Sequence, residues 1–131
     1  NANKNNELVF PELSYKTVGA AFHVFNKLGW GYSEKQYQQA FAKELRDLGI
    51  TFEREVYVPL EYNKEKVGKY FADFLIEKKI IVELKVMPKL GYIHAHQLLT
   101  YLHGANMRLG ILLYFTRDGV KYRRVLNPKV A

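Results

Sequence analysis

Residues 70–86 read YFADFLIEKKIIVELKV, and their pattern is the most informative about the fold. It contains the ends of two runs rich in β-branched and aromatic residues, 67–76 and 80–86, separated by Glu77-Lys78-Lys79. Two such runs with a short break between them predict a β-hairpin. If the three charged residues form the loop, Ile76 faces Ile80 across the ladder.

Three charged residues inside these apolar strands form the candidate site. In the predicted register Asp73 falls directly opposite Glu83, with Cβ atoms roughly 5 Å apart. Lys85 shares the face of Glu83 because strand side chains alternate. Opposed like charges destabilise a sheet unless a cation lies between them. Oxygen ligands favour Mg²⁺, with Mn²⁺ as a substitute, and such an ion can activate water against a phosphodiester.

Two alternatives remain open for this segment. An E-x-K pattern on a strand is common, and most charged strand faces are simply solvated. The loop also lacks the glycine or asparagine that short hairpins favour, so a bulge near Asp73 could bring the acids together instead.

The rest of the chain predicts an α/β fold in the order ααβββαββ. Apolar spacing predicts helices, and Ser33 with Gln36 forms a capping box at the start of the second one. Residues 1–12 are Asn-rich and predict a flexible leader, which leaves 13–131 as one domain. The expected helices are 14–28, 33–48 and 92–107, and the expected strands are 52–60, 67–76, 80–86, 109–115 and 122–126.

Composition limits the classes of protein. The 131 residues fit one domain, and the absence of cysteine excludes disulfides and thiolate metal sites. No apolar run approaches the roughly 20 residues that span a bilayer, so a soluble, cytoplasmic protein is expected. The formal net charge of +7 fits a polyanionic partner, although an unspecialised basic surface explains it equally well.

Several motifs together resemble the GxxExxY proteins, a branch of the PD-(D/E)XK nuclease superfamily related to RecB-like nucleases. The naming motif appears as Gly31-Tyr32-Ser33-Glu34-Lys35-Gln36-Tyr37, and Ala72-Asp73 and Val82-Glu83-Leu84-Lys85 match as well. The resemblance runs from about Val18 to Val125. It implies a restriction-endonuclease-like core, a mixed sheet of four to five strands flanked by helices, with Asp73 and Glu83 holding the metal beside Lys85.

The resemblance also implies roles for residues outside the hairpin. Glu34 would add a metal ligand or support one, and its spacing from Tyr37 predicts a place at the head of the buried helical stripe. The alternative for Glu34 is an acid that complements the helix dipole. Gln97 and Tyr101 match a Q-x-x-x-Y element, in which the glutamine lies near the catalytic lysine or the substrate.

Two further residues are candidates for contact with nucleic acid. His23 fits the G-x-x-x-H pattern of RecB-like enzymes, although an isolated helical histidine is more often plain surface. Lys89 belongs to the basic residues that follow the hairpin. Both are expected, with Tyr101, to contact nucleic acid.

The sequence therefore predicts a Mg²⁺-dependent nuclease that acts on nucleic acid, with DNA preferred. One alternative is a module that keeps the nuclease scaffold and binds nucleic acid without cutting it. Another is a homodimeric interaction domain, whose apolar and aromatic surface forms the interface.

Overall fold

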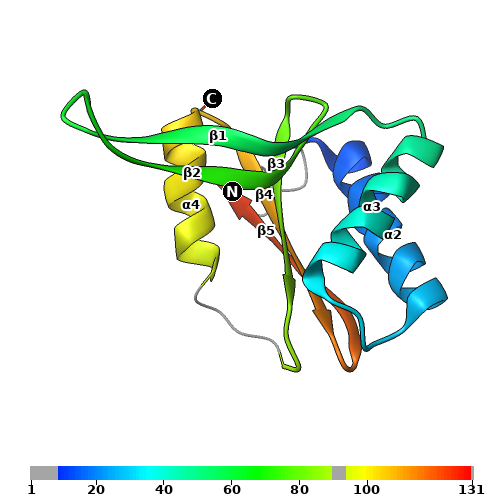
Figure 1. Ribbon diagram of the computed structural model, residues 1–131. Coiled ribbons are helices and arrows are strands. Elements are labelled where there is room, and N and C mark those ends of the chain that lie inside the picture. The colour runs from blue at the N-terminus through cyan, green and yellow to red at the C-terminus, as the bar shows by residue number, and fades with distance from the viewer. Residues whose placement is uncertain (1–8, 90–93, 131) are drawn as a thin grey trace.

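A computed structural model describes residues 9–89 and 94–130 (Figure 1). It confirms the expected order ααβββαββ. The helices are α2 (Pro11–Leu28), α3 (Glu34–Asp47) and α4 (His94–Ala105), and the strands are β1 (Phe52–Tyr62), β2 (Glu65–Ile76), β3 (Ile80–Val86), β4 (Leu109–Thr116) and β5 (Gly119–Leu126). Of the helices in these two ranges, none has the length and apolar content needed to span a membrane.

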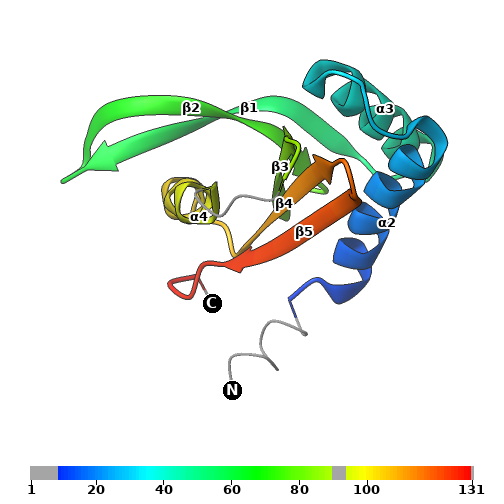
Figure 2. The ribbon, with the colours of Figure 1, turned by 90° about the horizontal axis from the view of Figure 1, so that it is seen from below.

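The five strands form one mixed sheet in the order β1-β2-β3-β4-β5. Neighbouring strands are antiparallel except β3 and β4, which are parallel and joined through α4. Helices α2 and α3 lie on one side of the sheet, and α4 lies on the other side beneath the long β1–β2 hairpin (Figures 1 and 2). The expected mixed sheet flanked by helices is confirmed.

The sheet separates two hydrophobic cores, one on each of its faces. The first core lies under α2 and α3 and includes Ile80, Val82 and Leu84 of β3. The second core lies under α4 and includes Ile81. Because strand side chains alternate, Glu83 and Lys85 share the face of Ile81 and therefore point toward the side of α4.

Of the two N-terminal helices, α3 starts as expected and α2 starts earlier than expected. The capping box of α3 is present, with the Gln36 backbone N–H donating to Ser33 Oγ over 3.1 Å and the Ser33 N–H donating to Gln36 Oε1 over 2.9 Å. Helix α2 begins at Pro11 instead of about residue 14, because proline suits the first helical turn. Val9 is buried in the first core, so residues 9–12 are part of the fold.

Some expectations concern residues outside the described ranges. Residues 1–8 lie there, so a flexible leader stays a prediction for them. Residues 90–93 lie there too, and the expected start of the third helix at residue 92 falls among them.

Helix α4 approaches β1 closely at Gly104. A Cβ added to Gly104 would lie 2.6 Å from the carbonyl oxygen of Pro59, which is a backbone atom and cannot rotate away. We expect Gly104→Ala to lower the free energy of unfolding by about 1–3 kcal/mol. The matched control is Gly19→Ala on α2, where a Cβ meets nothing within 4 Å and should stabilise by about 0.5–1 kcal/mol. Urea unfolding of both variants measures the difference, and equal stability would contradict the close approach.

Candidate active site

The β2–β3 hairpin has the predicted register. Ile76 pairs with Ile80, and the Lys79 N–H donates to the Ile76 carbonyl over 2.8 Å. Glu77 and Lys78 adopt φ values of 52° and 57°, the left-handed region that glycine or asparagine usually fills. The Thr51 N–H donates to Glu77 Oε2 over 2.9 Å, and the Glu77 N–H donates to the Thr51 carbonyl over 3.0 Å. These contacts stabilise the turn, which has no glycine or asparagine to favour its left-handed conformation.

Asp73 lies where the ladder between β2 and β3 ends and where one pair of the β1–β2 ladder is missing. Its ladder with β3 ends at Phe74 and Val82, one pair before Asp73 would meet Glu83. In place of that pair, the Leu84 N–H donates to Asp73 Oδ2 over 2.9 Å. The expectation of a direct cross-strand pair is therefore wrong, because the side chain of Asp73 takes over a bond to β3 that backbone would otherwise make.

The other neighbour of β2 is also irregular at this point. Arg54 pairs with Phe74 and Val56 pairs with Ala72, but the intervening Glu55 adopts φ 51° and makes no ladder pair with Asp73. Ala72 packs in the second core and Phe74 in the first, although simple alternation would place both on one face. A local irregularity at Asp73 therefore turns its side chain toward β3. The pairs on either side of it keep the same register, so it is not the bulge that the alternative proposed.

Glu83 is a buried carboxyl with spare hydrogen-bonding capacity. It is 6% exposed, and its Oε1 has no hydrogen-bond partner. Burial raises the pKa of Glu83 to about 9, with the charge and hydrogen bonding of Asp73 adding to the rise and Lys85 opposing it. A buried, unpartnered oxygen is costly. A cation beside it would favour the ionised form of Glu83 and use that oxygen.

Lys85 lies between Glu83 and the start of α4. Its charge lowers the pKa of Glu83, and it also contributes, after burial, to the lowered pKa of His94. His94 Nδ1 is buried without a hydrogen-bond partner. The ammonium group of Lys85 is therefore close enough to Glu83 to favour its ionised form.

Two stacked tyrosines lie on the side of the sheet that α4 covers, as do Glu83 and Lys85. The rings of Tyr70 from β2 and Tyr101 from α4 stack at 19°. Burial raises the pKa of Tyr70, with the charges of Glu83 and Asp73 contributing, and the same causes raise the pKa of Tyr101. The Tyr101 hydroxyl has a hydrogen bond with the exposed Gln97, whereas the buried Tyr70 hydroxyl has no hydrogen-bond partner. Among the described residues, Tyr70, Glu83 and His94 each carry an unpartnered buried atom around this site.

Tyr70 and His94 were not singled out as site residues from the sequence. Simple alternation along β2 would have placed Tyr70 on the face of Phe74 and Ile76, and only the irregularity at Asp73 brings it to the face of α4. No sequence signal shows that α4 lies against β2 next to Tyr70, because the contact between Tyr70 and Tyr101 depends on tertiary packing.

Glu34 lies at the first position of α3, and it is exposed rather than at the head of the buried stripe. Its charge opposes the lowering of the pKa of His94 by burial and Lys85. Glu34 is therefore within electrostatic reach of the end of the site where Lys85 lies. In the part of the chain that the structure describes, no group of three or more histidine and acidic side chains is arranged to hold a metal ion. Glu34 therefore does not complete a three-residue ligand set with Asp73 and Glu83.

Of the two remaining candidates, His23 lies apart from these residues. His23 is on α2, on the other side of the sheet, where its Nε2 lies 3.7 Å from Glu44 Oε1. Lys89 is exposed, three residues after the end of β3. The structure thus brings together Asp73, Glu83 and Lys85, with Gln97 and Tyr101 beside them.

The donor set fits a hard divalent cation. Asp73 and Glu83 offer carboxylate oxygens, and one Glu83 oxygen has no protein partner. Mg²⁺ is commonly held by only one or two carboxylates, with water or substrate oxygens in its other positions. Two protein ligands are therefore enough for Mg²⁺.

Comparison with known proteins gives three findings. The family model described as the PD-(D/E)XK nuclease superfamily matches residues 11–125. The crystal structure of SSO0001 is similar to this chain, with a TM-score of 0.56 and 23% sequence identity, over 95% of this chain and 60% of that one. At this identity the likeness concerns the fold, and this chain spans about 60% of the length of its structural relative. No curated protein matches the chain.

Proposed function

Because this chain belongs to the PD-(D/E)XK nuclease superfamily, we propose that it is a Mg²⁺-dependent nuclease that hydrolyses phosphodiester bonds, with DNA as its substrate. The observation that carries this proposal is the convergence of Asp73 and the buried, unpartnered Glu83 oxygen, with Lys85 on the same face of β3. The net charge of +7 supports a polyanionic substrate.

Asp73 and Glu83 are the residues that would hold the metal. A divalent ion there would supply a Lewis acid and an activated water. The Leu84 N–H fixes one oxygen of Asp73, and the other oxygen would bind the metal. The burial of Glu83 keeps bulk water from competing for its free oxygen.

Lys85 and Gln97 complete the proposed machinery. The half-buried ammonium of Lys85 would stabilise the negative charge that develops on the attacked phosphate and orient the attacking water. Gln97 is exposed and lies close enough to Tyr101 to lower its pKa, so it would position the substrate strand beside that ring. Glu34 and Lys89 would act from outside this group, through charge.

The finer assignment to the GxxExxY branch is also a proposal. In the structure, residues 31–37 of the motif form the corner between α2 and α3 and the first turn of α3. Gly31 has φ 123°, which only glycine adopts readily, and Tyr37 is fully buried with its hydroxyl donating to the Gly29 carbonyl. An intracellular location remains a prediction that accompanies the proposed substrate.

The test is cleavage of single- and double-stranded DNA by the purified chain. We expect product with Mg²⁺ or Mn²⁺ and none with EDTA. The second candidate is a module on the same fold that binds nucleic acid without cutting it. It is favoured by the finding that, within residues 9–89 and 94–130, no group of three or more histidine and acidic side chains could hold a metal ion. Such a module would hold DNA in EDTA, with an affinity that falls steeply with salt, and would release no product under any metal.

Tyr70 provides a prediction that separates the substrate site from the metal site. Its hydroxyl lacks a partner, so we expect it to donate to a phosphate oxygen of the bound strand. Tyr70→Phe removes only this donor, and kcat/KM should fall roughly 10-fold, the effect of one lost hydrogen bond of about 1.4 kcal/mol. Initial rates against substrate concentration measure this, with Tyr62→Phe, on an exposed ring of the distant β1–β2 turn, as the control. Unchanged kcat/KM in Tyr70→Phe would remove the hydroxyl from the site.

A further inference from the structure

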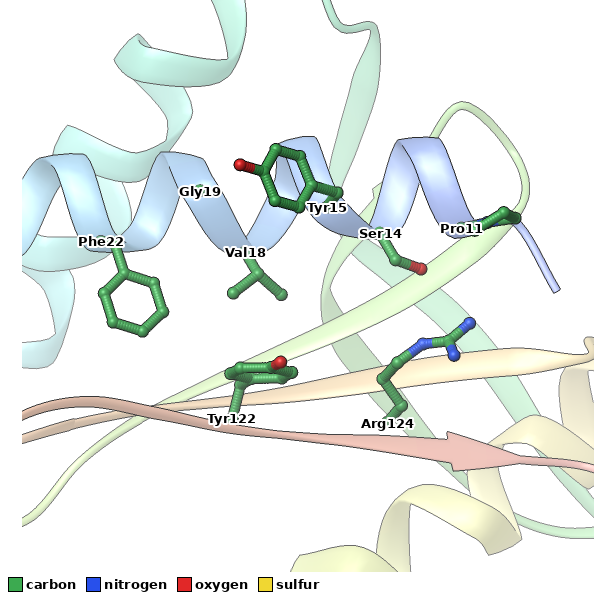
Figure 3. A pocket seen from close by; sticks show the side chains of 8 residues that line it. All are labelled: Pro11, Ser14, Tyr15, Val18, Gly19, Phe22, Tyr122 and Arg124. Carbon is green, nitrogen blue, oxygen red and sulfur yellow. The ribbon is translucent and has the colours of Figure 1, made fainter. Parts of the chain in front are cut away.

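A groove of about 710 Å³ lies between α2 and β5 (Figure 3). The helix contributes Pro11, Tyr15, Val18 and Phe22 to its lining, and the strand contributes Tyr122 and Arg124. Most of this lining is apolar or aromatic, and Phe22 and Tyr122 make an edge-to-face contact across it. The groove lies on the side of α2, whereas Glu83 and Lys85 face the side of α4, so it is separate from the candidate active site.

The strand that borders the groove is an edge of the sheet. β5 pairs with β4 on one side, and no described strand pairs with its other side. An edge strand presents unpaired backbone N–H and C=O groups to its surroundings. In Figure 3, α2 runs alongside β5 with side chains of both elements pointing into the space between them. A helix beside an open edge strand is the setting in which an extended peptide adds as a further strand.

The groove also contains an unused polar group. Ser14 lines it, is 5% exposed and has no hydrogen-bond partner at Oγ. A buried hydroxyl without a partner is uncommon in a native structure. This hydroxyl is closed off from solvent, so it lies behind the lining of the groove and does not itself reach a bound peptide.

Charge indicates what kind of segment would bind. The sequence of β5, GVKYRRVL, contains three cations and no acid, and Lys121 and Arg123 are exposed. A second copy pairing antiparallel through Tyr122 would place Lys121 of one copy opposite Arg123 of the other, which is unfavourable. An acidic strand would be attracted at the same positions.

We propose that this groove binds an extended, acidic segment of a partner protein, which adds to β5 as a sixth strand and places apolar side chains between α2 and Tyr122. The α2 stretch from Pro11 to Phe22 is roughly 16 Å long at 1.5 Å per residue, which matches about five extended residues at 3.3 Å each. The inference does not depend on the proposed nuclease function.

The experiment measures binding of a fluorescein-labelled seven-residue peptide in which aspartate alternates with leucine and phenylalanine. Fluorescence anisotropy with the full chain should show saturable binding. The double variant Lys121→Glu/Arg123→Glu should weaken it at least 10-fold. The matched control is Lys43→Glu/Arg46→Glu on exposed positions of α3, which changes net charge equally and should leave binding within about twofold of the unaltered chain at the same ionic strength.

Two further probes test the mode of binding. A peptide N-methylated at alternate residues cannot donate the ladder hydrogen bonds and should bind at least 10-fold more weakly. Tyr122→Ala, at a half-exposed ring, should weaken binding while leaving the fold intact by circular dichroism.

The proposal is overturned if the acidic peptide does not bind, if its lysine counterpart binds equally well, or if N-methylation has no effect. It is also overturned if the unaltered chain forms a dimer that Lys121→Glu/Arg123→Glu dissociates, since the groove would then hold a second copy. Peptide binding that appears only after removal of residues 1–8 would assign the groove to that segment and would equally overturn the proposal.

Discussion

Replacing Asp73 by asparagine is expected to abolish metal-dependent cleavage, lowering kcat about 1,000-fold or more. The amide oxygen of asparagine can still accept from the Leu84 N–H, so the contact to β3 is kept. The negative charge needed to hold the cation is lost, and a loss of several kcal/mol of transition-state stabilisation corresponds to this factor. Single-turnover cleavage of labelled DNA measures the rate, and titration with Mn²⁺ measures the metal affinity.

Lys85→Met is the companion variant that separates metal binding from cleavage. We expect it to retain Mn²⁺ affinity and to lose about 100-fold or more in kcat, because the cation beside the reacting oxygens is removed. Urea unfolding of both variants serves as the control for folding. Cleavage by Asp73→Asn at the rate of the unaltered chain would contradict the assignment.

Replacing Glu83 by glutamine is expected to stabilise the metal-free protein at alkaline pH while ending its activity. The pKa of Glu83 rises from its ordinary value of 4.5 to about 9, chiefly through burial. Between these values the unfolded chain carries an ionised Glu83 and the folded chain keeps the proton. The folded state thus binds more protons, and stability falls as pH rises from about 4.5 to about 9.

Glutamine resembles the protonated acid and removes this dependence. Each pKa unit corresponds to about 1.4 kcal/mol, so Glu83→Gln should exceed the unaltered chain by several kcal/mol at pH 8 and match it near pH 4. Denaturant titrations across this range in EDTA measure the difference. An unaltered chain with the same pH profile as Glu83→Gln would show that Glu83 ionises freely in the folded state.

Magnesium should offset part of this difference in stability at pH 8. A ligand that binds only the folded state stabilises it by about 2.7 kcal/mol at 100 times its dissociation constant. We expect this gain for the unaltered chain and not for Glu83→Gln. The same comparison shows whether the buried carboxyl is a ligand or only a structural acid.

Local patterns in the sequence were enough to predict the elements that present the site. The alternation in residues 80–86 predicts correctly that Glu83 and Lys85 share a face, and the Ser33 capping box predicts the start of α3. The register of the hairpin was also predicted, although its turn has no glycine, because apolar residues flank the charged loop on both sides.

Features that depend on packing could not be predicted from the same patterns. The rotation of β2 at Asp73 depends on the left-handed Glu55 of β1, which no local signal marks. The Tyr70–Tyr101 stack depends on how α4 crosses the sheet, and the groove at Tyr122 depends on where α2 rests beside β5. Glu34 was expected near the buried stripe because only spacing was considered, but its position in the first turn leaves it exposed.

The most direct test of the proposed metal site is an anomalous difference map from crystals of the chain soaked with Mn²⁺ near pH 8. We expect a peak bounded by the carboxylates of Asp73 and Glu83, within roughly 2.5 Å of an oxygen of each, with the Lys85 ammonium nearby. Ordered Mn²⁺ bound elsewhere, or a Glu83 carboxyl that keeps its proton with no peak beside it, would contradict the account.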